Sequence, residues 1–135
     1  YDSLLKSFNL SAVFCYFVLV IIFLFKAPGA SDVARSVNYH IGSGTFLMAK
    51  SFFMTGSISS AYTFFGNLIF FAPLGYFISY YLKRFGSGVC LFLGVVFLII
   101  VEGYQYAFNC GNTDIDEFIL NYIGYFLGYL SYKYI

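Results

Sequence analysis

The sequence predicts an all-α integral membrane protein, with about four transmembrane helices in an antiparallel bundle. Its composition is 61% hydrophobic and only 10% charged, whereas soluble domains are about a quarter charged. Four apolar segments approach the roughly 20 residues that a helix needs to cross a bilayer. No alternating pattern indicates a β-barrel, the other architecture that satisfies its backbone groups in lipid. We therefore treat residues 1–135 as a single transmembrane domain.

The four expected spans are residues 8–25, 61–82, 89–108 and 118–134. A short turn containing Lys83 and Arg84 separates the second span from the third, so these two should form an antiparallel hairpin. Lys and Arg in short loops favour the cytoplasmic side of a membrane. This turn therefore predicts a multi-pass protein with both termini in the cytoplasm.

Residues 27–60, between the first and second spans, are too polar to cross the membrane and too apolar to form a simple loop. Ser31–Val37 predicts a short helix capped by Ser31. The aromatic and methionine side chains that follow, such as Phe52 and Met54, favour an interfacial or re-entrant element.

The most unusual residue is Glu102, which ends the apolar run Val89–Val101. An ionisable group near the bilayer centre costs about 2.5–3.5 kcal/mol on insertion scales, so such residues usually face the bundle interior and mark function. With a rise of about 1.5 Å per residue, Asn67, Glu102 and Asn121 should lie at similar depths on one side of the membrane.

These polar groups predict one internal pocket on the extracytoplasmic side, which should also hold residues 27–60 and the loop Cys110–Glu117. We expect the pocket to have an acid at its mouth, from Asp114 or Glu117. The residues expected to line it are Asn67, Glu102, Gln105 and Asn121.

The residues of the expected pocket can also be explained by structural roles alone. The run Asp114–Glu117 fits the start of a helix, with acids near the positive end of its dipole. If Asp116 only anchors this helix, Asp116→Asn should lower stability by about 0.5–2 kcal/mol and leave activity largely intact. Asn67 and Asn121 could form hydrogen bonds between helices, worth about 0.6 kcal/mol each. Gly124 and Gly128 form a G-x-x-x-G pair that permits close helix packing.

Composition excludes other classes of function. A net charge of +1, without a basic stripe, argues against a nucleic-acid partner. Cys15 and Cys90 lie in apolar runs and Cys110 has no nearby partner, so neither a disulfide nor a thiolate metal site is expected. No cofactor is expected, and no Ser or Cys stands beside a His as a nucleophile–base pair would.

Two motifs resemble those of VanZ-like membrane proteins. The run Asn67-Leu-Ile-Phe-Phe-Ala-Pro73-Leu-Gly75 is similar to the Asn-x-x-x-Phe-x-Pro-x-Gly motif of that family. A second set of residues is similar, in order and spacing, to the second signature of the family. It consists of Glu102-x-x-Gln105 followed by Asp114-Ile-Asp116-Glu117-x-x-x-Asn121-x-x-Gly124-x-x-x-Gly128. The resemblance covers roughly residues 60–130.

The chain also departs from the family pattern. Arg35-Ser-Val-Asn38 only partly resembles the Asn-Leu-Ile-Pro-Phe loop of the family, because Pro and Phe are missing. The family commonly has Arg between the positions of Gln105 and Asp114, and this chain has none there. Arg35 or Lys50 could replace that cationic partner of Glu102 or Asp114. The full set of candidate ligand-binding residues is Asn67, Glu102, Gln105, Asp114, Asp116, Glu117, Asn121 and Arg35.

The resemblance implies a bacterial cytoplasmic-membrane protein of the cell envelope, in a family named for a protein that lowers susceptibility to the glycopeptide antibiotic teicoplanin. We favour a binding module that engages membrane lipid, a lipid-linked cell-wall molecule or a lipoglycopeptide in the outward-facing pocket. The first alternative is a membrane-embedded hydrolase or transferase acting on a lipid-linked substrate, with Glu102, Asp114 and Glu117 as catalytic acids or ligands of a divalent cation. The second is a small transporter that uses Glu102.

Overall fold

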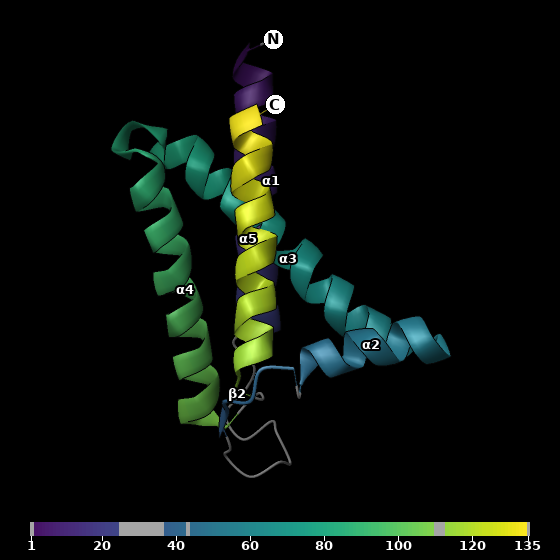
Figure 1. The fold of residues 1–135 in the computed structure, drawn as a ribbon. Helices are drawn as coiled ribbons and strands as arrows, with labels where there is room; N and C mark the ends of the chain where they lie inside the picture. Colours follow the sequence, from purple (N-terminus) through teal and green to yellow (C-terminus); the bar gives the residue numbers. More distant parts are fainter. Residues whose placement is uncertain (1, 25–36, 43, 110–112, 135) are drawn as a thin grey trace.

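The computed structural model describes residues 2–24, 37–42, 44–109 and 113–134 (Figure 1). These residues form five α-helices: α1 (Asp2–Leu24), α2 (Thr45–Thr55), α3 (Ile58–Leu82), α4 (Ser87–Phe108) and α5 (Ile115–Tyr134). A 3₁₀ turn, η1 (Lys83–Phe85), joins α3 to α4. Two short strands, β1 (Val37–Asn38) and β2 (Thr113–Asp114), precede α2 and α5.

The four expected apolar segments correspond to α1, α3, α4 and α5, so the predicted all-helical class is confirmed. Each helix begins before its apolar segment, because polar residues such as Ser87 and Asp116 form the first turns. Within the described residues, two helical segments are long and apolar enough to cross a membrane, Phe64–Phe85 and Ser87–Phe108. The apolar stretch of α1 is shorter and covers Leu10–Ile22.

The segment between the first two expected spans contains α2, which packs along the first part of α3 and also contacts α5. Figure 1 shows α2 lying across the end of the molecule, while α1, α4 and α5 run in roughly the same direction in that view, with α1 behind α5. Gly56 ends α2 in the left-handed conformation (φ 68°) and donates its N–H to the carbonyl of Phe52. The helix predicted at Ser31–Val37 lies outside the described residues, apart from Val37, which belongs to β1.

The closest packing joins α3 and α5, which cross obliquely in Figure 1. A side-chain carbon added at Gly128 would collide with the carbonyl of Ala72, and one added at Gly124 would collide with the backbone of Leu68. Gly75 of α3 stands in the same relation to the backbone of Tyr125. The prediction that Gly124 and Gly128 permit close helix packing is confirmed, because the backbones of α3 and α5 come together at these glycines, where a side chain would collide.

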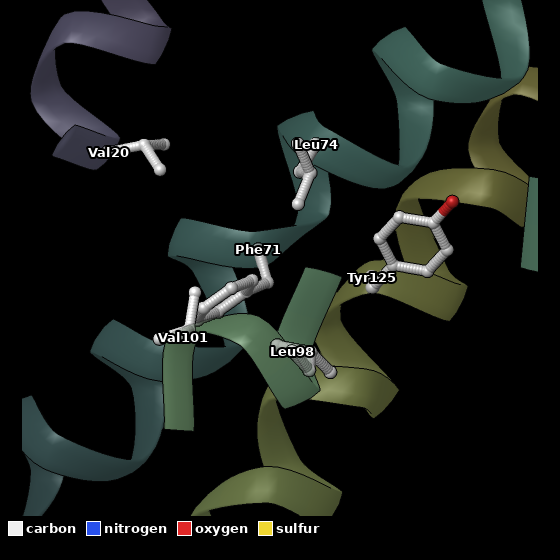
Figure 2. Close-up of a cluster of buried hydrophobic side chains, with 6 residues drawn as sticks. All are labelled: Val20, Phe71, Leu74, Leu98, Val101 and Tyr125. Atoms are coloured by element: carbon white, nitrogen blue, oxygen red, sulfur yellow. The ribbon is translucent and has the colours of Figure 1, made fainter. Parts of the chain in front are cut away.

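A buried apolar cluster joins four helices (Figure 2). Its members are Val20 of α1, Phe71 and Leu74 of α3, Leu98 and Val101 of α4, and Tyr125 of α5. The ring of Tyr125 occupies the space that a side chain at Gly94 would need, and its hydroxyl donates to the carbonyl of Cys90. Tyr125 therefore fastens α5 to α4.

The connection between α1 and α3 uses a second tyrosine. The hydroxyl of Tyr16 donates to the carbonyl of Phe70 at 2.7 Å. Pro73 lies within α3, lacks an N–H and crowds the carbonyl of Ile69. The hydroxyl of Tyr16 thus donates to a backbone carbonyl in the helical turn that Pro73 disturbs. Helix α3 continues through Pro73 without a break.

Candidate functional site

The acid-rich start of α5 is joined to the segment before α2. Strands β1 and β2 pair in parallel, with Val37 opposite Thr113 and Asn38 opposite Asp114. This pairing brings residues far apart in sequence to one end of the molecule, beside the last turns of α4 (Figure 1). The expected proximity of the 27–60 segment and the acid loop is therefore confirmed for the residues that form these strands.

Asp116 is wholly buried, and its carboxylate accepts backbone hydrogen bonds from two glycines. The N–H of Gly42 lies 2.8 Å from Oδ1 and 3.0 Å from Oδ2, and the N–H of Gly44 lies 2.9 Å from Oδ2. Gly42 has a φ of 85°, a conformation that favours glycine. A side chain at Gly44 would collide with the carboxylate of Asp114. Asp116 therefore has a structural role, in which it fastens the loop before α2 to the start of α5.

Asp114 caps α5. Its Oδ1 accepts the backbone N–H of Asp116 at 2.9 Å, and the helix begins at Ile115. A carboxylate at this position satisfies one of the unpaired N–H groups of the first turn and lies at the positive end of the helix dipole. The expectation that the run Asp114–Glu117 begins a helix is confirmed.

Glu117, expected at the pocket mouth, contacts Asn67. The amide Nδ2 of Asn67 donates to Oε1 of Glu117 at 3.3 Å, which joins α3 to α5. Asn67 thus takes part in a hydrogen bond between helices, the structural reading that the sequence left open for it.

Two buried polar atoms stand out because they have no hydrogen-bond partner among the described residues. They are Oε2 of Glu102 and Oδ1 of Asn121. Glu102 is 9% exposed and Asn121 is 3% exposed. Burying a polar group without a hydrogen bond is costly, so such atoms are uncommon and are often explained by function.

Glu102 and Asp114 line one open pocket of about 480 Å³ between α4 and the start of α5, which we call the Glu102 pocket. The rest of its wall is apolar or aromatic and consists of Val37, Tyr39, Ile99, Gly103, Tyr106, Ile115 and Phe118. The structure therefore brings together two of the predicted acids from different elements.

The other predicted residues lie elsewhere. Asn67 and Asn121 do not line the Glu102 pocket, and neither does Gln105, which is half-buried on α4. Arg35 lies outside the described residues, and Lys50 is exposed on α2. Within the described part of the chain, no group of three His, Cys, Asp or Glu side chains is placed to hold a metal ion, so Glu102, Asp114 and Glu117 do not form one.

Sequence reasoning missed two tyrosines of the pocket. Tyr106 follows Glu102 by one helical turn, and this spacing could have placed both on one face of α4. Tyr39 reaches the pocket only through the pairing of β1 with β2, for which the sequence carries no local signal. The glycines in Ile41-Gly42-Ser43-Gly44 were a visible sign that backbone N–H groups could hold a carboxylate there.

Comparison with known proteins identifies the family of the chain. Curated proteins and solved structures gave no significant match. The VanZ/LLP1 family matches residues 11–135, which include most of α1, the helices α2 to α5 and both acids of the Glu102 pocket. A match over this much of the sequence establishes that the chain belongs to the VanZ/LLP1 family.

Proposed function

We propose that this chain is a four-span protein of the bacterial cytoplasmic membrane whose Glu102 pocket binds an amphiphilic envelope molecule. The ligand is a lipid-linked cell-wall molecule or a lipoglycopeptide, and its binding lowers susceptibility to teicoplanin or related drugs. Membership of the VanZ/LLP1 family supports the membrane and envelope setting.

The observation that carries the proposal is the carboxyl group of Glu102. It is buried, one of its oxygens has no partner among the described residues, and it lines a pocket with mostly apolar walls. Ligand sites commonly combine apolar walls with few polar groups, in volumes of about 300–1,000 Å³. A hydroxyl, amide or ammonium group of the ligand would donate to Glu102, and its apolar part would contact Ile99 and Phe118.

The position of the pocket also supports an outward-facing site. It lies at the end of α4 opposite the turn that contains Lys83 and Arg84. Since short basic loops favour the cytoplasm, the opposite end faces outward. Tyr39 and Tyr106, both exposed, stand at this end, as expected of aromatic side chains at a membrane–water interface.

Glu102→Gln tests the proposal, because it keeps the shape of the side chain and replaces its ionisable carboxyl group with an amide. The full chain, produced in a teicoplanin-susceptible bacterium, should lose most of its protective effect. In nanodiscs, the variant should bind a fluorescent teicoplanin about tenfold more weakly, since a buried hydrogen-bonding group left without its partner costs about 1–3 kcal/mol. A matched glycopeptide without the acyl chain should bind the wild-type chain less tightly.

Ser131→Ala provides the control, because Ser131 is exposed near the far end of α5 and its hydroxyl donates only to the carbonyl of Leu127. This variant should protect and bind as the wild type does. Equal protection and binding by Glu102→Gln would overturn the proposed site.

A membrane-embedded hydrolase or transferase is the second candidate, favoured by the presence of two carboxylates in one pocket. Glu102 and Asp114 could act as general acid and base on a lipid-linked substrate. The purified chain would then release product from such a substrate, and Glu102→Gln would abolish release while it retained substrate binding. The binding proposal expects substrate to be recovered unchanged.

A further inference from the structure

A second pocket lies at the other end of the molecule, where α3 ends, α4 begins and α5 approaches its last turn (Figure 1). It measures about 220 Å³, and we call it the turn pocket. The residues that line it are Ser79, Lys83, Gly86, Ser87, Cys90, Tyr129, Tyr132 and Lys133.

The turn pocket carries two positive charges from different elements. Lys83 comes from η1 and Lys133 from the last turn of α5. Their ammonium groups lie 5.9 Å from the ring centroid of Tyr80 and 5.8 Å from that of Tyr134, respectively. Neither lysine forms an ion pair with a carboxylate of the described residues. Glu102 and the acids at the start of α5 lie at the opposite end of their helices. No described carboxylate therefore pairs with the two charges, although both lysines stand at helix C-termini, where the helix dipole favours a cation.

The pocket also offers neutral hydrogen-bond donors. Gly86 precedes α4 with a φ of 87°, and no side chain caps the first turn of the helix. The unpaired N–H groups there form the positive end of the helix dipole. Tyr129 is only 6% exposed and its hydroxyl has no hydrogen bond among the described residues, although it lines the pocket. The body of Tyr129 is buried while its hydroxyl is accessible, so this hydroxyl can donate to an acceptor oxygen of a ligand in the pocket.

We infer that the turn pocket binds a phosphate group, supplied by the headgroup of an anionic phospholipid or by free phosphate. Lysine binds phosphate as a point charge, and helix N-termini donate N–H groups to phosphate oxygens. The volume is smaller than that of most sites for drug-sized ligands and suits a single phosphate group. Exposed Tyr80, Tyr81 and Tyr134 surround this end, and such aromatic residues stand at the level of lipid headgroups. Basic pockets between membrane helices on the cytoplasmic side are known to take lipid headgroups.

The test measures binding to the full chain in detergent with three probes: short-chain phosphatidylglycerol, inorganic phosphate and the matched diacylglycerol. The variants are Lys83→Gln, Lys133→Gln and Tyr129→Phe. Arg84→Gln is the matched control, because Arg84 carries the same charge in the same turn, lies over the ring of Phe85 and does not line the pocket.

Lys83→Gln or Lys133→Gln should weaken the binding of phosphatidylglycerol about tenfold, because each removes a charge-assisted hydrogen bond. Tyr129→Phe should weaken it about threefold, as loss of a neutral hydrogen bond would. Arg84→Gln should bind as the wild type does. Circular dichroism of every variant should match the wild type, which separates a binding loss from unfolding.

The probes distinguish the sources of the phosphate. Binding of phosphatidylglycerol alone assigns the pocket to a lipid headgroup, and binding of inorganic phosphate with the same lysine dependence assigns it to free phosphate. Three results would overturn the inference. Diacylglycerol could bind as tightly as phosphatidylglycerol, neither phosphate probe could bind, or Arg84→Gln could weaken binding as much as the lysine variants do.

Discussion

Asp116→Asn is the most informative single change in the chain, because the carboxylate of Asp116 connects the loop before α2 to the buried start of α5 by hydrogen bonds to Gly42 and Gly44. Asparagine has nearly the same shape but replaces one acceptor oxygen with an NH₂ donor. If the amide oxygen takes the place of Oδ2, it can still accept from both glycines, but the buried NH₂ then faces the N–H of Gly42 and has no acceptor there. If it takes the place of Oδ1, the NH₂ faces the N–H of Gly44. One donor always faces another donor.

The size of the effect follows from these contacts. An unsatisfied buried donor costs about 1–3 kcal/mol, and a hydrogen bond to a charged group contributes about 1.5–3 kcal/mol. Gly42 is exposed and Gly44 half-buried, so water can compensate in part. We therefore expect the opening free energy of this loop to fall by about 1–3 kcal/mol. This range overlaps the range of about 0.5–2 kcal/mol expected if Asp116 only anchored its helix, and it extends above it.

Hydrogen–deuterium exchange of a peptide containing Gly42 and Gly44 measures this opening directly. Exchange at these amides should accelerate about 5- to 150-fold in Asp116→Asn if the loop opens locally. Glu102→Gln is the control, since it makes the same chemical change on α4 and has no hydrogen bond to either glycine. Unchanged exchange in Asp116→Asn would refute the assignment of Asp116 as the residue that fastens this loop.

Two further predictions concern the packing of α5. Gly128→Ala should destabilise the fold by about 1–3 kcal/mol, because the added carbon would collide with the carbonyl of Ala72, whereas Gly88→Ala meets open space and should be neutral or slightly stabilising. Denaturant titration in mixed micelles compares the two, and equal stabilities would contradict the close contact between α3 and α5. Tyr125→Phe should cost about 0.5–1.5 kcal/mol through loss of the hydrogen bond to the carbonyl of Cys90. The same denaturant titration measures this loss, and an unchanged unfolding midpoint in Tyr125→Phe would contradict it.

The helices could be predicted from the sequence because their signal is local. Apolar length alone identified α1, α3, α4 and α5, and the end of α4 at Phe108 matched the expected residue. The starts of the helices were less predictable, since they depend on polar capping. Asp114 shows why, because its side chain extends α5 back to Ile115, before the apolar run begins.

The candidate site could be predicted only in part, because its contacts join distant segments. Depth along the helices placed Asn67 and Glu117 on one side, but their pairing depends on the register of α3 against α5. Glycine contacts set that register, with Gly128 opposite Ala72. The contact between Asp116 and Gly42 spans 74 residues and depends on a loop conformation that no helical pattern encodes.

The two ends of α5 differ in how firmly they hold α4, and this difference bears on ligand binding. Near the turn pocket, the ring of Tyr125 packs on Gly94 and its hydroxyl reaches the carbonyl of Cys90, so α4 is fixed to α5 there. Toward Glu102, the space between α4 and the start of α5 is an open pocket instead. Backbone contact along the glycines holds α3 and α5 closely together behind this pocket. A ligand that enters beside Glu102 would therefore contact α4 at the end that Tyr125 does not hold, with the α3–α5 pair behind it.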